Sequence, residues 1–317
     1  MNKFLQVAAS LIVSSVCAWH LSGNAAENAS NFWKVSNEKH TLYILGVTHV
    51  GDQRQYPLGA PILDAFNQSS IYITESRLAY EPLENVKDVL RREYTAESGK
   101  TLRALLATPA CMEVEGSATL TSSIQAALPS DLGTKVLGLS PRATIHQIAN
   151  PAVDNRQLSM KSLQPAMAVE SSLRLQARKQ GIALGTLDDE YWRGIDQLGP
   201  KQTCELLLTL VRFHARSDRD QLAVSNYTKV LAALLNHDSA GTLAAYLEQY
   251  EAPGQNDDSS ALRVWMKNRN TNMARILEET SNRIGFVAIG AAHLPGKNGV
   301  ISILGRHGYK TEPINLP

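Results

Sequence analysis

Two short segments of this chain carry the same pattern of residues, and each ends on a histidine. In one, an apolar run leads to Gly46 and then His49, and in the other a similar run leads to Gly290 and then His293. A carboxylate, Glu75, closes a third apolar run. Imidazole nitrogens and carboxylate oxygens are ligands that divalent metal ions take in proteins. The pattern predicts a shared metal site, although each histidine taken singly is typical of an ordinary hydrogen-bonded loop.

Arg269 interrupts the apolar face of the helix expected over residues 260–283. Met266 and Met273 lie on that face at helical spacing, and Arg269 falls between them. A buried guanidinium needs a partner, because its charge is costly to remove from water. Two interpretations stay open, namely a structural pair with a core carboxylate, or a clamp for an anion or oxyanion. Asn270, the next residue, could orient a ligand or a water.

The elements that must position these residues alternate between strands and helices along the chain. This order predicts an α/β fold with a mostly parallel central sheet flanked by helices. Ligands bind beyond the carboxyl ends of such strands, which is where the two histidines and Glu75 stand. The resemblance between the two histidine segments indicates two weakly repeated halves, and the stretch about 190–260 is interpreted as a helical insertion. Strands are expected at 41–46, 71–75, 135–139, 182–187, 285–290 and 309–314.

The composition excludes several classes of protein. The chain has 317 residues, is 44% hydrophobic and carries a formal net charge of +1. It is therefore too apolar for a disordered chain, and it has no excess of basic charge that would indicate nucleic-acid binding. The sequence leaves the oligomeric state open.

The N-terminal residues 1–26 have the pattern of a secretory signal peptide. Lys3 is followed by an uncharged, mostly apolar stretch and then by small residues. The alternatives are a membrane anchor and a lipoprotein attached through Cys17. Cleavage leaves a domain over 27–317 with no stable membrane span, exported across the inner membrane and expected in the periplasm. An oxidising compartment would permit a disulfide between Cys111 and Cys204, and two buried thiols are the alternative.

Several segments resemble the TraB/GumN/Tiki family, in its bacterial GumN-like branch. The matching motifs run from about residue 31 to the C-terminus and include FWKV at 32–35, LYILGVTHV at 42–50, ITE at 73–75, NRNxxMA at 268–274 and GFVAIGAAHLxG at 285–296.

The resemblance implies a fold related to the erythromycin-esterase-like and ChaN-like proteins. Animal Tiki members are regarded as metal-dependent proteases that use two GxxH histidines and a strand-end glutamate. Carried over, those positions are His49, His293 and Glu75, with Arg269 as the supporting residue. Family members often carry a second acid shortly after the glutamate, whereas Ser76 follows it here.

Taken together, these features predict a metal-dependent, peptidase-like hydrolase of the cell envelope, acting on a peptide or small-molecule substrate. His49, Glu75 and His293 would bind a divalent ion such as Mn, Co or Zn, and Glu75, Arg269 and Asn270 would serve catalysis. One alternative is a metal-free hydrolase in which histidine and glutamate activate water directly, as in the esterase-like relatives. Another is a non-catalytic protein that binds haem or a metal.

Overall fold

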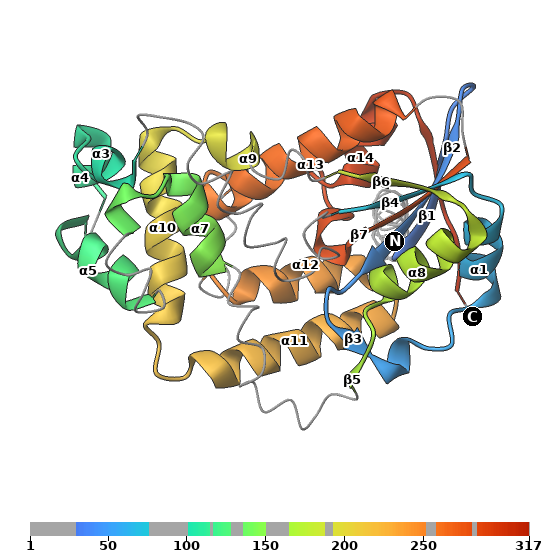
Figure 1. Ribbon diagram of the computed structural model, residues 1–317, viewed down its shortest axis with the longest axis horizontal. Coiled ribbons are helices and arrows are strands. Elements are labelled where there is room, and N and C mark those ends of the chain that lie inside the picture. Colours follow the sequence, from blue (N-terminus) through green and yellow to red (C-terminus); the bar gives the residue numbers. More distant parts are fainter. Residues whose placement is uncertain are drawn as a thin grey trace, which may run out of the picture.

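A central sheet and a cluster of helices lie side by side in the computed structural model, and one long helix, α13 (Ala261–Glu279), belongs to both (Figure 1). The expected α/β class with a mostly parallel sheet flanked by helices is confirmed. The structure describes residues 30–75, 101–114, 117–127, 136–149, 165–187, 193–251, 258–280 and 284–316.

The main sheet has six strands in the order β6-β4-β7-β2-β1-β8. Strand β7 pairs in parallel with β4 on one side and with β2 on the other, so the carboxyl ends of these three strands lie at the same edge. Strand β6 also runs parallel to β4, whereas β1 is antiparallel to both of its neighbours. The bounds are β1 (Phe32–Ser36), β2 (Thr41–Val47), β4 (Ile71–Thr74), β6 (Ala183–Thr186), β7 (Ile284–Gly290) and β8 (Lys310–Pro313). A separate two-stranded ladder joins β3 (Gly51–Asp52) to β5 (Pro165–Ala166).

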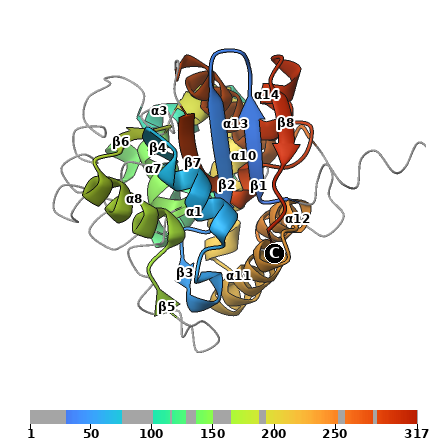
Figure 2. The same cartoon turned by 90° about the vertical axis from the view of Figure 1, so that its right-hand side faces the viewer.

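Helices cover both faces of the main sheet (Figure 2). Helices α1 (Ala60–Asn67) and α8 (Val169–Gln180) pack on one face, and α13 and α14 (Val300–Arg306) pack on the other. Because successive side chains of a strand point to opposite faces, the neighbours Phe286 and Val287 of β7 enter different cores. Each such side chain contributes about 1.5–3 kcal/mol when fully buried.

Most of the other helices share a further apolar core, to which Leu206, Leu207 and Leu210 of α10 contribute, whereas α4 and α11 pack in smaller clusters of their own. Buried Cys111 of α4 and Cys204 of α10 form a disulfide with their Cα atoms 5.6 Å apart, so the two cysteines are paired. The helices in this part of the molecule are α3 (Leu102–Leu106), α4 (Pro109–Met112), α5 (Ser117–Ala127), α7 (Pro141–Ala149), α9 (Arg193–Asp196), α10 (Pro200–His214), α11 (Arg219–Leu235) and α12 (Ser239–Glu248).

Helix α13 begins in the helical cluster and ends under the sheet. Ser260 caps its first turn by accepting a hydrogen bond from the backbone N–H of Arg263. Trp265 belongs to the helical core, and Leu277 belongs to the core beneath the sheet. Arg269 lies between these two parts with only 6% of its side chain exposed, as its place in the apolar stripe predicted.

The observed elements differ from the expected ones in two ways: one expected strand is absent from its place, and additional short strands are present. The strand expected at 135–139 is wrong, because residues Val136–Gly138 form a 3-10 helix, with Leu137 inside it and Leu139 after it packed on the helical core. Short apolar runs of this length do not distinguish a strand from a buried helical turn. Strands β1, β3 and β5 were not expected. The signal peptide expected at 1–26 lies outside the described residues, and no helix within the described ranges is long and apolar enough to cross a membrane.

Candidate active site

The carboxyl ends of β2, β4 and β7 bring three of the predicted residues together. Nε2 of His49 lies 3.3 Å from Oε2 of Glu75, and Nε2 of His293 lies 3.5 Å from Oε1 of the same carboxylate. The two histidines therefore face the same carboxylate, each toward a different oxygen. Their convergence follows from the parallel pairing of neighbouring strands, because His49 follows β2, Glu75 follows β4 and His293 follows β7.

His49 is held by a carboxylate that sequence reasoning missed. Its Nδ1–H donates to Oε1 of Glu170 at 2.7 Å, and Glu170 is buried in the first turn of α8. The hydroxyl of Tyr72 donates to the backbone carbonyl of Glu170 at 2.9 Å, which fixes this turn of the helix. Burial disfavours the charged imidazole, but the carboxylates of Glu75 and Glu170 outweigh it and raise the pKa of His49 well above its ordinary value. Half of the side chain, 52%, is exposed, so solvent reaches it.

His293 is buried and held by an amide. The side-chain N–H of Asn270 donates to the backbone carbonyl of Asn298 at 2.7 Å, so the amide oxygen faces the ring. That oxygen lies 2.6 Å from Nδ1 of His293 and accepts its proton, which leaves Nε2 with a lone pair toward Glu75. Burial and the charge of Arg269 lower the pKa of His293 and outweigh the opposing effect of Glu75.

Glu75 is buried at the centre of the site and held ionised from several directions. Nη2 of Arg269 donates to its Oε1 at 2.5 Å, and the backbone N–H of Gly290 donates to its Oε2 at 2.7 Å. Burial alone would raise the pKa of Glu75, but His293, His49 and Arg269 together hold it well below its ordinary value. Of the two interpretations of Arg269, the structure therefore shows a pair with a buried carboxylate, and that carboxylate belongs to the candidate site.

The two glycines of the repeated motif are required for close packing. A Cβ on Gly46 would lie 2.7 Å from Cδ1 of Leu294, so the strand could not pass this close to the turn that carries His293. A Cβ on Gly290 would lie 3.0 Å from Oε2 of Glu75 and 3.5 Å from Nε2 of His49. Gly46 thus allows the two turns to pack together, whereas Gly290 leaves room inside the site.

The comparison with protein families supports the resemblance seen in the motifs. A family model described as the TraB/PrgY/gumN family matches residues 31–313, which include every residue of the candidate site. The chain belongs to the TraB/PrgY/gumN family. No curated protein and no solved structure matches the chain significantly.

The donor chemistry of this TraB/PrgY/gumN site suits a divalent metal ion. Each imidazole gives its Nδ1–H to an oxygen acceptor and turns Nε2 toward Glu75, which is the arrangement of metal-binding histidines. On His293, a lone pair faces a carboxylate oxygen, and a cation or a donor between the two atoms would relieve their repulsion. As the side chains stand, however, no three His, Cys, Asp or Glu residues in the described ranges are already arranged to hold a metal ion.

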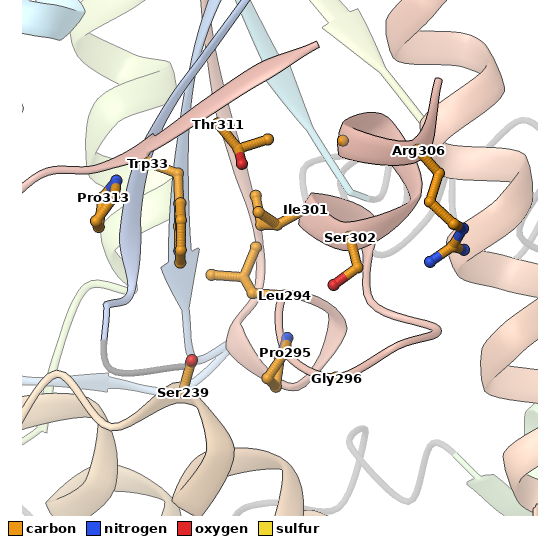
Figure 3. A pocket seen from close by; sticks show the side chains of 11 residues that line it. Trp33, Ser239, Leu294, Pro295, Gly296, Ile301, Ser302, Arg306, Thr311 and Pro313 are labelled. Atoms are coloured by element: carbon orange, nitrogen blue, oxygen red, sulfur yellow. The ribbon is translucent and has the colours of Figure 1, made fainter. Parts of the chain in front are cut away.

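A cavity of about 320 Å³ lies beside the turn that carries His293 in this family member (Figure 3). Trp33 and the residues Leu294 to Gly296 form part of its wall, and Ser302 and Arg306 of α14 form another part. None of its lining residues is acidic, and the three converging side chains do not line it. The cavity is therefore a neighbour of the candidate site and not the site itself.

Proposed function

We propose that this protein is a hydrolase of peptide-type or related acyl bonds, and that it works with a divalent metal ion in the cell envelope. The observation that supports the proposal most directly is that two imidazole Nε2 atoms face the two oxygens of one buried carboxylate. His49, His293 and Glu75 would hold the ion. When bound, a divalent ion in such a site polarises a carbonyl and makes a water more acidic.

The surrounding residues prepare these three side chains for that role. Glu170 and Asn270 fix the ring orientation and tautomer of the two histidines, so both Nε2 atoms stay directed at Glu75. Arg269 and the backbone N–H of Gly290 hold the Glu75 carboxylate in place. The lowered pKa of Glu75 makes it a weak base near neutral pH, which favours a ligand or orienting role over that of general base. Arg269 and Asn270 then act through Glu75 and His293.

A metal-free hydrolase is the second candidate, and one observation favours it. The carboxylates of Glu75 and Glu170 raise the pKa of His49 well above its ordinary value, which favours a proton on its Nε2 facing Glu75 in the absence of metal. A half-exposed imidazolium there could donate that proton to a leaving group as a general acid. His293, with its lowered pKa, would be the neutral partner that accepts a proton from water.

The disulfide between Cys111 and Cys204 supports placement outside the reducing cytosol. Disulfides persist in oxidising compartments such as the periplasm, and this one is buried in the helical cluster. With the signal-like pattern of residues 1–26, it supports export across the inner membrane. A peptide or another small molecule of the envelope is then the expected substrate.

Metal analysis of the exported, untagged protein separates the two candidates. The metal-dependent proposal expects about one divalent ion per chain, loss of peptide or ester hydrolysis on chelation, and recovery when Mn, Co or Zn is returned. His49→Asn and His293→Asn should each lose both the ion and the activity. Hydrolysis that survives complete removal of metal would establish the metal-free candidate instead. Absence of any hydrolysis, together with a Soret band after haem addition, would contradict both and indicate a haem-binding protein.

A further inference from the structure

Helix α9 lies against α13 at the position of Arg269, and its point of contact is a glycine. A Cβ built on Gly194 would lie 2.9 Å from Cγ of Arg269 and 3.4 Å from Cδ1 of Trp265. Gly194 is helical and is not among the described glycines with a positive φ angle, so its backbone does not require glycine. In a helix, alanine is more favourable than glycine by about 0.8–1 kcal/mol. The space that Gly194 leaves is therefore its structural contribution.

We propose that Gly194 is a positioning residue for the candidate site. Its missing side chain lets the aliphatic stem of Arg269 lie against α9, and this places the guanidinium on Glu75. The inference rests on the proposed function, since it assumes that a correctly held Glu75 carboxylate serves the reaction.

The contact between Gly194 and Arg269 is maintained because several interactions hold α9 in place. Ile195, the next residue, is buried in the helical core. Asp196 forms an ion pair with Arg142 at 3.2 Å, which ties α9 to α7. The side-chain N–H of Asn268 donates to the backbone carbonyl of Gly194 at 3.4 Å, a long hydrogen bond that links α9 to α13 directly. An added methyl group would therefore displace the stem of Arg269 and not the helix.

A small displacement at Cγ matters because the guanidinium stands at the far end of the same side chain. Rotation that relieves a clash at Cγ moves Nη2 further than it moves Cγ, and Nη2 lies 2.5 Å from Oε1 of Glu75. The ring of Trp265, 5.2 Å from Cζ of Arg269, limits where the guanidinium can go. Misplacement of a site group by about 1 Å can reduce turnover about 100-fold.

Gly194→Ala tests the proposal, with Gly199→Ala as its matched control. Gly199 lies five residues further along, and a Cβ built on it meets nothing within 4 Å. Gly194→Ala should lower kcat about 10–100-fold with little change in KM, whereas Gly199→Ala should keep the wild-type values. The Nε–H resonance of Arg269, assigned by its absence in Arg269→Ala, should shift in Gly194→Ala and stay in place in the control. An unshifted resonance, or a kcat equal to that of the control, would overturn the inference.

A double-mutant cycle keeps the test decisive if Gly194→Ala unfolds the protein. Arg269→Ala removes the Cγ atom that the new methyl group meets, so Gly194→Ala should cost no unfolding free energy in that background. An equal cost in both backgrounds would show that the methyl group clashes elsewhere, and it would contradict the proposal. The cycle and the resonance need no substrate. A protein that hydrolyses nothing would therefore refute the proposed function while leaving the contact between Gly194 and Arg269 to be judged separately.

Discussion

The two GxxH turns share a sequence pattern but give their histidines opposite surroundings. His49 is half exposed and stands between the carboxylates of Glu75 and Glu170, which raise its pKa. His293 is buried against an amide and near the guanidinium of Arg269, and its pKa is lowered. The repeated pattern therefore places both rings against one carboxylate, while the groups around each ring shift the two pKa values in opposite directions. Divergent environments around one shared group are typical of paired acid and base roles.

Removing the shared carboxylate should have the largest effect, because both histidines and Arg269 contact it. Glu75→Gln leaves the buried Arg269 guanidinium without its charged partner, and the free energy of unfolding should fall by about 3–5 kcal/mol. Hydrolysis should fall to background, since the carboxylate that both Nε2 atoms face is then lost. Urea unfolding and an activity assay measure the two effects. As a control, Glu248→Gln breaks an exposed pair with Lys229 and should cost about 0–1 kcal/mol. Equal costs for the two variants would contradict the central role of Glu75.

Changing the charge of the residues that accept from the two Nδ1 atoms, Glu170 and Asn270, should have a smaller effect. Glu170→Gln removes a negative charge from His49 and should lower its pKa, whereas Asn270→Asp adds one beside His293 and should raise that pKa. Each change should reduce metal affinity or activity about 10–100-fold, as is usual for groups that orient a ligand. Histidine ring resonances followed by NMR against pH, after chelation, report the two pKa values. Shifts of the same sign in both variants would refute the assignment of partners.

Substitutions of the two motif glycines should affect different properties, namely stability at Gly46 and turnover at Gly290. Gly46→Ala forces a methyl group into Leu294 and should lower the free energy of unfolding by about 1–3 kcal/mol, as overpacking does. Gly290→Ala keeps the N–H that Glu75 accepts but inserts a methyl group 3.0 Å from its Oε2. It should affect turnover more than stability. Thermal unfolding and kcat, measured on both variants, check this. A larger loss of stability in Gly290→Ala, with a larger loss of kcat in Gly46→Ala, would contradict the prediction.

The smallest effect is a dependence of stability on pH with opposite signs for the two histidines. The pKa of His49 is raised above 6.5, so its contribution is present below pH 6.5 and is lost as pH rises through the folded pKa. The pKa of His293 is lowered, so its contribution is present above pH 6.5 and is lost as pH falls toward the folded pKa. Chelated protein should therefore lose stability on both sides of about pH 6.5.

Urea unfolding across pH tests the two limbs separately. His49→Asn should flatten the alkaline limb, and His293→Asn should flatten the acid limb above the range in which Glu75 titrates. If either variant flattened the opposite limb, the two pKa directions would be wrong.

The sequence predicted the parts of the site that depend on local pattern. Short apolar runs that end on Gly46 and Gly290 indicated strands, and parallel strands must bring their carboxyl ends to one edge. The helical stripe around Arg269 likewise predicted its burial. These conclusions needed only periodicity and the general topology of an α/β fold.

Partners that meet only in the tertiary fold were not predictable from the sequence. Glu170 lies 121 residues from His49 and stands in a helix whose register against the sheet no local signal defines. The pairing of Cys111 with Cys204, separated by 93 residues, also depended on packing. The strand expected at 135–139 failed because its leucines fit a buried helical turn equally well. Local pattern thus specified where the reactive groups stand, and packing specified what surrounds them.

The strand order also sets the sequence of events as the chain is made. Strands β2 and β4 emerge early, yet they do not pair with each other, because β7 from residues 284–290 lies between them. Until those residues are synthesised, the β1–β2 hairpin and the β4–β6 pair cannot be joined into one sheet, and such long-range closure makes folding slow. The complete sheet can therefore form only when the chain is nearly finished. A chain cut after residue 283 would keep His49 and Glu75 but lack the strand that joins them.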